Sequence, residues 1–386
     1  MSTGFELSRE HEEFRRSVRE FAEAEIAPHA ATWDREHHFP VEVVQRMGEL
    51  GLFGLTAPEE YGGAGEDGDF TSLCVAIEEI GRVDQSMGIT LEAGVGLGIN
   101  PILTFGTPEQ KQTWLPDLVA GRRLAGFGLT EPEAGSDAGA TRTAARLDGG
   151  EWVIDGAKQF ITNSGTDITR FVTVTAVTGE ASGRKEISTI IVPNGTPGFT
   201  VGPAYDKVGW HASDTHPLSF EGARVPEGNL LGTRGRGFAN FLHILDEGRI
   251  AIAALSTGAA EGCLEAARDY ARQRIVFGEP LSTRQHTQFT LARMQARVHT
   301  ARLAWHQAAR LRDAGRDFKT AAAIAKLVAG EAAMDNARDA TQVFGGNGFM
   351  NEYPVARHYR DSKILEVGEG TTEVQLLVIA RALGVA

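Results

Sequence analysis

The sequence has little cysteine and no run of basic residues. Its 386 residues include 2 cysteines, Cys74 and Cys263, and neither belongs to a CxxC motif or a histidine cluster. Such a pair does not form a disulfide framework, and no residues with metal-ligand spacing occur, so we expect no metal site. The formal net charge is -13, and Lys and Arg are scattered. This argues against a nucleic-acid surface, but a local basic cleft for an anionic cofactor is compatible with it.

The sequence also lacks long apolar runs. Residues 1–21 carry Glu and Arg at helical spacing and contain no apolar core of a signal peptide. No stretch of about eighteen apolar residues stands out, so we expect no membrane span and a cytoplasmic protein. With 42% hydrophobic and 23% charged residues, the composition is that of a globular protein with two or three domains.

Three zones of different periodicity follow one another. Apolar residues recur three and four apart over residues 7–119, which indicates helices. β-branched runs at 152–154, 171–177 and 188–192 indicate strands, with turns at 148–150, 155–156 and 194–195. Ala-rich helical patterns return at 250–271, 289–312 and 320–340. We predict an α+β multidomain fold: an N-terminal all-α domain (1–122), a central antiparallel β-barrel or sandwich domain (123–235) and a C-terminal four-helix-bundle domain (236–386).

Two segments of the β zone can contact a flat ring or a phosphate. The first, GLTEPEAGSDAG at 128–139, has small residues that let amides and hydroxyls approach a ligand closely. The second, FITNS at 160–164, closes a strand and places a hydroxyl two residues after an aromatic ring. Taken alone, a capped loop explains the first segment equally well, and a core Phe and a turn Thr explain the second segment better.

Three segments of the last zone carry further candidates. RIVFG at 274–278 places Arg274 near a helix end, where it can bind pyrophosphate or be solvated. QVFGGNGF at 342–349 is a sharp turn with exposed amides and also a helix C-cap. In EVGEGTTEVQ at 366–375, Glu369 lies between two glycines before a last helix, where it can project into a cleft or stabilise the helix dipole.

The order and spacing of these segments resemble the acyl-CoA dehydrogenase family over the whole chain. GLTEPEAGSDAGA and QVFGGNGFMNEYPVARHYRD resemble the two family signatures, and RIVFG and EGTTEVQ stand in register with them. The resemblance implies three domains (α, β, α), bound FAD, a homotetramer built as a dimer of dimers, and electron-transferring flavoprotein as electron acceptor. It also implies an acyl-CoA substrate and a place in fatty-acid β-oxidation.

The resemblance further implies roles for residues of this chain. Glu369 is the base that takes the α-proton while a β-hydride passes to the flavin, giving a trans-2-enoyl-CoA. Hydrogen bonds from the Glu369 amide and a flavin hydroxyl stabilise the developing enolate, and a dry cleft raises the pKa of the base. The implied flavin-ring residues are Phe127, Leu129, Thr130, Gly135, Ser136, Phe160 and Thr162, and Thr371 and Glu373 complete the cofactor site. Those for the adenosine and pyrophosphate half, some across a subunit boundary, are Arg274, Phe277, Gln285, Gln342 and Gly346. Those for the CoA thioester are Ser136, Asp246, Arg249 and Gly370.

Two details bear on the alternatives. Some branches of the family carry the base directly before an arginine on an earlier helix, but here Gly248 precedes Arg249, so that position is vacant. No arginine lies between Met87 and Leu103, which disfavours a dicarboxylic acyl-CoA, because its distal carboxylate needs a partner in a dry pocket. The alternatives left open are a flavin oxidase or monooxygenase of this fold, a dicarboxylic substrate, the enoyl-CoA reductase direction, and a flavin-free binding subunit.

Overall fold

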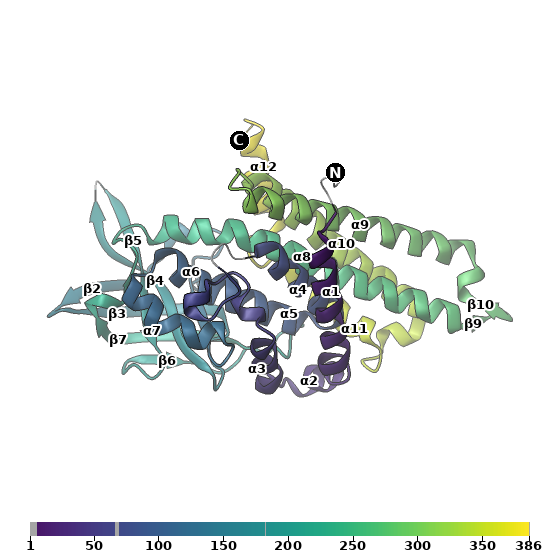
Figure 1. Ribbon diagram of the computed structural model, residues 1–386, viewed down its shortest axis with the longest axis horizontal. Coiled ribbons are helices and arrows are strands. Elements are labelled where there is room, and N and C mark those ends of the chain that lie inside the picture. Colours follow the sequence, from purple (N-terminus) through teal and green to yellow (C-terminus); the bar gives the residue numbers. More distant parts are fainter. Residues whose placement is uncertain (1–5, 66–68, 182, 386) are drawn as a thin grey trace.

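A computed structural model describes residues 6–65, 69–181 and 183–385, and its helices and strands follow the three predicted zones (Figure 1). The first zone is helical. Two π-helical segments, η1 (Ala22–Ile26) and η4 (Ala93–Ile99), interrupt its α-helices. The α-helices are α1 (Arg9–Phe21), α2 (Ala30–Glu36), α3 (Val41–Glu49), α4 (Phe70–Val83), α5 (Gln85–Glu92), α6 (Asn100–Phe105) and α7 (Pro108–Val119).

The second zone is one eight-stranded sheet. Its strands are β1 (Leu124–Gly128), β2 (Ala144–Asp148), β3 (Glu151–Thr162), β4 (Thr169–Ala181), β5 (Arg184–Pro193), β6 (Phe199–Val201), β7 (Thr215–Pro226) and β8 (Leu230–Leu231). They pair in the order β6-β7-β3-β2-β4-β5-β8, and β1 also pairs with β4.

Of the two forms predicted for the central antiparallel domain, barrel or sandwich, the barrel is wrong, and the sheet also contains parallel pairs. Within the described residues β6 and β8 end the chain of pairings and do not pair with each other, so the sheet is open. β1 runs parallel to β4, and β2 makes a single parallel pair with β4 at Ala144 and Val177. A parallel pair needs a long connection, which the residues between β1 and β4 provide. Strand periodicity reports which face is buried and does not report whether a sheet closes.

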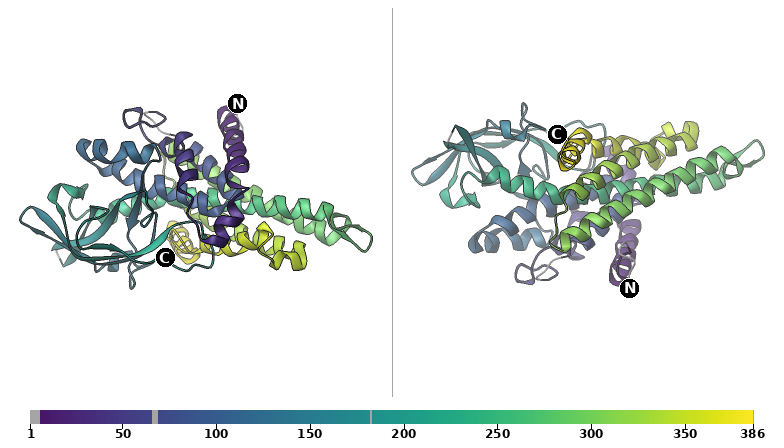
Figure 2. Two further views of the ribbon diagram at one scale, coloured as in Figure 1. Left: turned by 90° about the horizontal axis from the view of Figure 1, so that it is seen from below. Right: turned by 90° about the horizontal axis from the view of Figure 1, so that it is seen from above.

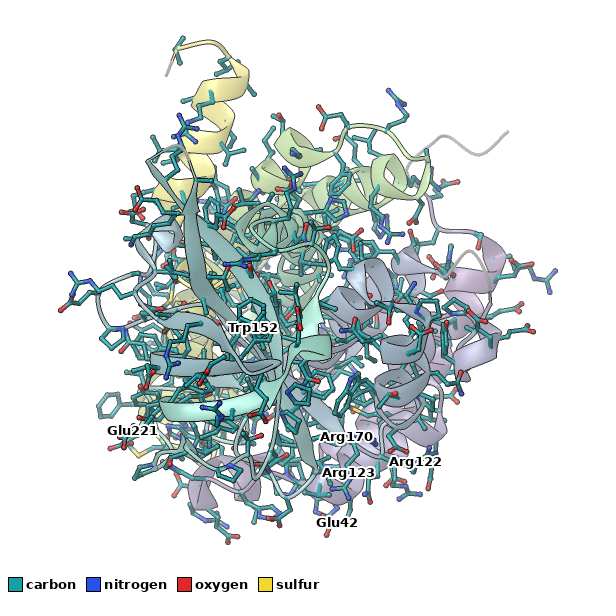
Figure 3. The ribbon with its side chains drawn as sticks, turned by 90° about the vertical axis from the view of Figure 1, so that its left-hand side faces the viewer. Glu42, Arg122, Arg123, Trp152, Arg170 and Glu221 are labelled. Carbon is teal, nitrogen blue, oxygen red and sulfur yellow. The ribbon has the colours of Figure 1, made fainter. Side chains whose placement is uncertain are left out.

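The predicted strand runs are confirmed, but the turn expected at 155–156 is wrong. Asp155 and Gly156 lie inside β3, where the register with β7 shifts between Ile154 and Gly156. Gly156 has φ +148, and a Cβ there would lie 2.5 Å from the Thr143 hydroxyl, so the glycine permits a bulge against the neighbouring strand. The indole of Trp152 on the same strand is buried and donates to the Glu227 carbonyl at 3.2 Å (Figure 3).

Arginines gather where this sheet meets the N-terminal helices. Figure 3 shows Arg122, Arg123 and Arg170 close together at this border. Asp117, on α7, pairs with Arg122 at 2.8 Å and with Arg170 on β4. The guanidinium of Arg170 also lies over the Trp114 ring, 5.2 Å from its centroid. These contacts fix α7 against the edge of the sheet.

The third zone is dominated by three long helices that pack against one another (Figures 1 and 2). They are α8 (Gly237–Gln273), α9 (Gln285–Asp313) and α10 (Lys319–Phe344), followed by the shorter α11 (Pro354–Ser362) and α12 (Thr372–Ala382). The hairpin of β9 (Ile275–Val276) and β10 (Glu279–Pro280) joins α8 to α9 at the end far from the sheet. The four-helix bundle stays a prediction.

α8 also packs tightly against α4, and this joins the two helical domains. A Cβ at Gly258 would lie 2.0 Å from the Glu78 carbonyl oxygen, so only glycine allows the helices to approach so closely. Glu78 is buried, and its carboxylate accepts hydrogen bonds from the Trp305 indole at 2.7 Å and from Arg302 at 2.8 Å. A fully paired buried charge at such an interface fixes one relative placement of the helices.

Two apolar stretches are long enough to cross a membrane, which corrects the expectation from the sequence. They are Gln85–Phe105 and Gly237–Gln273. In each, most of the apolar window is buried inside the protein, 72% and 83% respectively. They are the central helices of the fold, and their length and composition reflect that burial.

Candidate active site

Glu369 lies on a tight loop between the 3-10 helix η9 (Lys363–Glu366) and α12. Its φ is +54, a left-handed conformation that is uncommon for a residue with a side chain, and the next residue, Gly370, has φ +92. The Gly370 carbonyl accepts hydrogen bonds from Lys326 Nζ at 2.8 Å and from Gln375 Nε2 at 2.9 Å. Thr371 caps α12 by accepting from the Val374 amide. The loop is therefore held from both sides in a conformation it would not adopt alone.

The carboxylate of Glu369 lies directly against the backbone of α8. A Cβ at Gly248 would be only 2.9 Å from Glu369 Oε2, so a side chain at position 248 would displace the carboxylate. Oε2 itself is buried and has no hydrogen-bond partner within the described chain. The vacant position before Arg249 thus has a physical role, because it makes room for the carboxylate of Glu369.

Glu92 is a second buried carboxylate at the same place, and the sequence analysis missed it. It is 1% exposed, and neither of its carboxylate oxygens finds a hydrogen-bond partner among the described residues. A Cβ at Gly248, which would lie 2.9 Å from Glu369 Oε2, would lie 3.7 Å from Glu92 Oε1. Glu92 ends α5 where the π-helix η4 begins, and such π-helical turns are frequent at functional sites. A lone acidic residue in an apolar stretch was the available signal.

The two carboxyls have different proton affinities. Burial raises the pKa of Glu369 to about 6, while the positive charges of Lys326 and Arg249 act in the opposite direction. Burial, together with the charge of Glu369, raises the pKa of Glu92 well above its usual range. At neutral pH Glu369 is therefore ionised, while burial and the charge of Glu369 make Glu92 bind a proton more tightly than a solvated glutamate does.

Asp246 and Arg249, both predicted to hold the thioester substrate, lie on α8 beside Gly248. Both are buried, and Arg249 Nη1 donates to Asp246 Oδ1 at 2.6 Å. Arg249 Nε is buried and has no hydrogen-bond partner in the described part of the chain. Gly370 follows Glu369 directly, and Asp246 and Arg249 lie on either side of Gly248, the residue of α8 that the Glu369 carboxylate approaches.

The face of the sheet near the end of β3 is suited to a flat ring. Phe160 has φ +62 and is 59% exposed, and its ring centroid is 5.2 Å from that of Tyr205. Thr162 lies two residues further along the strand, and the Thr130 carbonyl accepts from the amide of Gln159 at 2.8 Å; the side-chain hydroxyls of both threonines make no hydrogen bond to any described residue. An exposed aromatic face with free hydroxyls nearby fits a heteroaromatic cofactor with a polar edge, which is what an isoalloxazine ring is.

Two predicted ring-lining residues have structural roles as well. Phe127 is buried, and its ring stacks on Phe241 of α8 at 5.3 Å, so it joins β1 to the long helix. Leu129 is half-buried, and its carbonyl accepts from Lys158 Nζ at 3.0 Å. Gly135 is exposed, and a Cβ there would meet nothing within 4 Å.

A buried ion pair fixes this loop to the sheet, and the sequence analysis missed both partners. Lys158 has a fully buried side chain and donates to Glu131 at 2.7 Å and to the Thr175 hydroxyl at 3.1 Å, as well as to Leu129. Glu131 in turn accepts from the amides of Arg142 and Thr143 at 2.7 and 3.0 Å. Hydrogen bonds to Lys158 hold the pKa of Glu131 at about 2 despite burial, and burial lowers that of Lys158 to about 8. Phe160 follows two residues later on the same strand.

The end of β3 and the end of α5 are in contact. Asn163, directly after Thr162, has φ +58 and donates through Nδ2 to the Thr90 carbonyl at 3.3 Å. Thr90 precedes Glu92 by two residues on α5. The ring-binding face at Phe160 and Thr162 and the carboxyl pair therefore border one region of the molecule.

A second group of predicted cofactor residues lies at the other end of the molecule. Arg274, Phe277 and Gln285 surround the β9–β10 hairpin, far from the sheet (Figure 1). Gln342 and Gly346 join them at the end of α10, where Tyr270 stacks on Phe344 at 4.0 Å. With a rise of about 1.5 Å per residue, this group lies roughly 36 Å along α8 from Arg249. One chain alone does not bring the two groups together.

Phe277 shows how open this distal group is. The ring is 98% exposed, and its residue has φ +50. Thr371 and Glu373, in contrast, lie beside Glu369 at the start of α12. No group of three or more His, Cys, Asp or Glu side chains in residues 6–65, 69–181 and 183–385 could hold a metal ion.

Family models cover almost the entire chain. The acyl-CoA dehydrogenase N-terminal domain matches residues 8–122, the middle domain matches 126–223 and the C-terminal domain matches 235–384. A probable acyl-CoA dehydrogenase of Bacillus subtilis is 49% identical over 98% of this chain and 99% of its own. The mitochondrial short-chain specific acyl-CoA dehydrogenase of Bos taurus is 44% identical over 97% of this chain and 90% of its own.

Solved structures agree with these matches. Butyryl-CoA dehydrogenase from Megasphaera elsdenii has a TM-score of 0.94 and 41% identity, covering 98% of this chain and 99% of that one. A chain from a structure of the electron transferring flavoprotein of Acidaminococcus fermentans gives the same values. Glutaryl-CoA dehydrogenase from Mycobacterium smegmatis in complex with FADH2 has a TM-score of 0.92 and 32% identity, covering 98% of this chain and 95% of that one.

Proposed function

The chain belongs to the acyl-CoA dehydrogenase family, and we propose that it oxidises a short-chain acyl-CoA to the trans-2-enoyl-CoA with Glu369 as the base. It is an oxidoreductase of the CH–CH group, and FAD is its cofactor. The observation that carries the proposal is the position of Glu369, whose carboxylate enters a buried space against Gly248 and has one oxygen without a partner.

The environment of Glu369 suits it to remove a weakly acidic proton. A pKa of about 6 leaves the carboxylate ionised at neutral pH and more basic than a solvated glutamate. Glu369 takes the α-proton of the thioester, and its own backbone amide donates to the thioester carbonyl, where negative charge develops. The FAD supplies the acceptor for the hydride that leaves the β-carbon. Asp246 and Arg249 orient the substrate, together with Ser136 and Gly370.

The residues available for FAD fall into two distant groups, which supports a site shared between subunits. We propose that the ring lies on Phe160, near Thr130, Ser136 and Thr162, in one subunit. The distal group at Arg274 and Phe277 then binds the adenosine and pyrophosphate half of a cofactor held by a second subunit. A dimer of dimers, giving a homotetramer, satisfies this arrangement.

The remaining residues of both groups complete the proposed cofactor site. Its ring-side members are Phe127, Leu129, Gly135, Thr371 and Glu373, and its distal members are Gln285, Gln342 and Gly346. The domain boundaries near residues 122 and 235 are part of the proposal, and the ranges of the three family models support them. Three helices of the C-terminal domain pack as expected for the proposed four-helix bundle.

The relatives named short-chain specific and butyryl-CoA dehydrogenase support a short acyl chain. The absence of arginine between Met87 and Leu103 argues against a dicarboxylic acyl-CoA, because its distal carboxylate would need a cation in a dry pocket. The similarity to a chain solved with an electron transferring flavoprotein supports such a flavoprotein as the electron acceptor. We place the reaction in the cytoplasm and in the direction of fatty-acid β-oxidation, in keeping with bacterial relatives.

An anaerobic titration tests this proposal. The purified FAD enzyme is mixed with butyryl-CoA, octanoyl-CoA and glutaryl-CoA while the visible flavin absorbance is recorded. We expect butyryl-CoA to bleach the flavin at the lowest concentration and glutaryl-CoA to leave it oxidised. Bleaching by glutaryl-CoA alone would overturn the substrate class, and no bleaching by any thioester would overturn the reaction.

A further inference from the structure

We propose that Lys326 is a positioning residue that clamps the Glu369 loop and holds a positive charge beside the base. This inference rests on the proposed role of Glu369. Lys326 lies on α10, 43 residues before the base in the sequence, and no motif pointed to it. Its side chain is buried, and its ammonium group donates to the Gly370 carbonyl at 2.8 Å.

The contact between α10 and the loop extends over a full helical turn. Gly330 lies four residues after Lys326, on the same face of α10. A Cβ at Gly330 would be 2.9 Å from the Leu365 carbonyl oxygen, so the glycine brings the helix backbone against the segment that leads to Glu369. Lys326 then reaches the far end of that segment. Because the backbone of α10 lies this close to the loop, the Lys326 side chain has little conformational freedom, and the position of its ammonium group is fixed.

The orientation of the Gly370 carbonyl explains why the Glu369 loop depends on a hydrogen bond from Lys326. Glu369 and Gly370 both have positive φ, and this turns the carbonyl oxygen of Gly370 toward α10 and Gln375. Gln375 is fully buried and supplies one donor, while Lys326 supplies the other. Without Lys326 the carbonyl keeps a neutral partner only. The left-handed turn that aims the Glu369 side chain at Gly248 then loses one of its two fixed points.

The charge of Lys326 is available to the base. Three N–H groups belong to the ammonium, and no carboxylate oxygen within the described residues lies close enough to form an ion pair with it. Burial lowers the pKa of Lys326 to about 8, and the negative charge of Glu369 opposes that effect. Lys326 is therefore a cation at neutral pH, and it faces the base without being neutralised by a direct partner.

The other charges around Glu369 come from every element packed against it. On α5, burial and the charge of Glu369 raise the pKa of Glu92 well above its usual range, and on α8 Arg249 is paired with Asp246 at 2.6 Å. Glu366 and Glu373 flank the loop itself and add negative charge near Lys326. Of the two cations that favour ionised Glu369, Lys326 is the one outside an ion pair.

Neutralising Lys326 should move the pH dependence of the reaction in a known direction. Loss of the cation disfavours the ionised form of Glu369, so the pKa of the base rises and the acid limb of the reduction rate moves to higher pH. We expect a shift of about one pH unit for Lys326→Gln, in the range typical of a nearby opposite charge. Lys326→Arg keeps the charge and should leave the limb within about 0.3 unit of the wild type.

The experiment follows anaerobic reduction of the bound flavin by butyryl-CoA from pH 5 to pH 9 in stopped flow. Wild type, Lys326→Gln, Lys326→Arg and a Lys111→Met control, altered on distant α7, are compared. Infrared titration of the carboxyl band that disappears in Glu369→Gln measures the protonation of the base without turnover. FAD content and the thermal unfolding midpoint report on folding.

The outcomes separate the two proposals. The inference is supported if the acid limb and the pKa of the Glu369 carboxyl both move to higher pH in Lys326→Gln. Both must stay unchanged in Lys326→Arg and in the Lys111→Met control. An unmoved limb in Lys326→Gln overturns it, as does an equal shift in Lys326→Arg. If Lys326→Gln does not fold, Lys326→Arg decides: a folded enzyme with an unmoved limb supports the inference, and a displaced limb overturns it. A wild-type flavin that no thioester reduces contradicts the proposed function itself.

Discussion

Two buried lysines can be compared: Lys158 on the sheet side of the proposed site and Lys326 on its helical side. Each is buried, each donates to the carbonyl of a loop that lines the site, and burial lowers the pKa of each to about 8. Lys158, on the sheet, has a carboxylate at 2.7 Å and a hydroxyl at 3.1 Å as further partners. Lys326, on the helical side, bonds one carbonyl and no carboxylate in the described structure.

This difference in hydrogen-bond partners distinguishes the side of the site that stabilises the fold from the side that we propose takes part in the reaction. On the sheet side, the charges of Lys158 and Glu131 satisfy each other, so the loop that precedes Phe160 is fixed. On the helical side, Glu369 Oε2 and both oxygens of Glu92 have no partner in the described residues, although each is buried. An unsatisfied buried polar group costs stability, and such groups are retained at sites that bind or react. In the proposed function the sheet side holds the cofactor, and the helical side performs the proton transfer.

Removing Lys158 should produce the largest loss of stability. Lys158→Met leaves Glu131 buried without its cation, and breaking such a pair costs about 3–5 kcal/mol of unfolding free energy. Urea unfolding followed by the fluorescence of tryptophans, including Trp152 on the same strand, measures the change. Lys158→Met combined with Glu131→Met should recover part of the loss. A change below about 1 kcal/mol for Lys158→Met would contradict the framework role.

Adding one methyl group at Gly248 should damage the reaction and spare the fold. Gly248→Ala places a Cβ where Glu369 Oε2 lies, and a displaced base lowers the reduction rate by about 10²-fold. The substitution itself favours a helix by about 1 kcal/mol, so the thermal midpoint should not fall much. Stopped-flow reduction and thermal unfolding are measured together. Gly228→Ala, where a Cβ meets nothing within 4 Å, is the matched control. Full activity in Gly248→Ala would contradict the claim that the reaction depends on the close approach of the Glu369 carboxylate to α8.

Replacing Glu92 by Gln should have the smallest effect. Burial and the charge of Glu369 favour the protonated form of Glu92, so Glu92→Gln should change the local charge little, and the acid limb of flavin reduction should stay within about 0.3 pH unit of the wild type. If Glu92 were ionised, its removal would favour ionised Glu369 and move the limb to lower pH. A downward shift of one unit in the stopped-flow pH profile would therefore show that both carboxyls of the pair are charged.

The sequence predicts the framework better than the surroundings of the base. Periodicity places the three zones, the runs of β4 and β5, and Glu369 on a loop before the last helix. It cannot show that Glu92, Gly248 and Lys326 meet at that loop, because they come from three separate helices and each fits a buried helix face on its own. The open sheet is missed for a related reason, since closure depends on pairing between distant strands. Lys158 is a charged residue within a strand, and the alternation of apolar and polar residues does not by itself indicate that its side chain is buried in an ion pair.

The most direct measurement is the anaerobic reduction of the flavin in Glu369→Gln by butyryl-CoA. The substituted side chain keeps its size and its place against Gly248 but cannot accept a proton. We predict that FAD stays bound and butyryl-CoA still binds, seen as a shift of the flavin spectrum, while reduction slows by about 10³-fold or more. Reduction at the wild-type rate would contradict the assignment of Glu369 as the base.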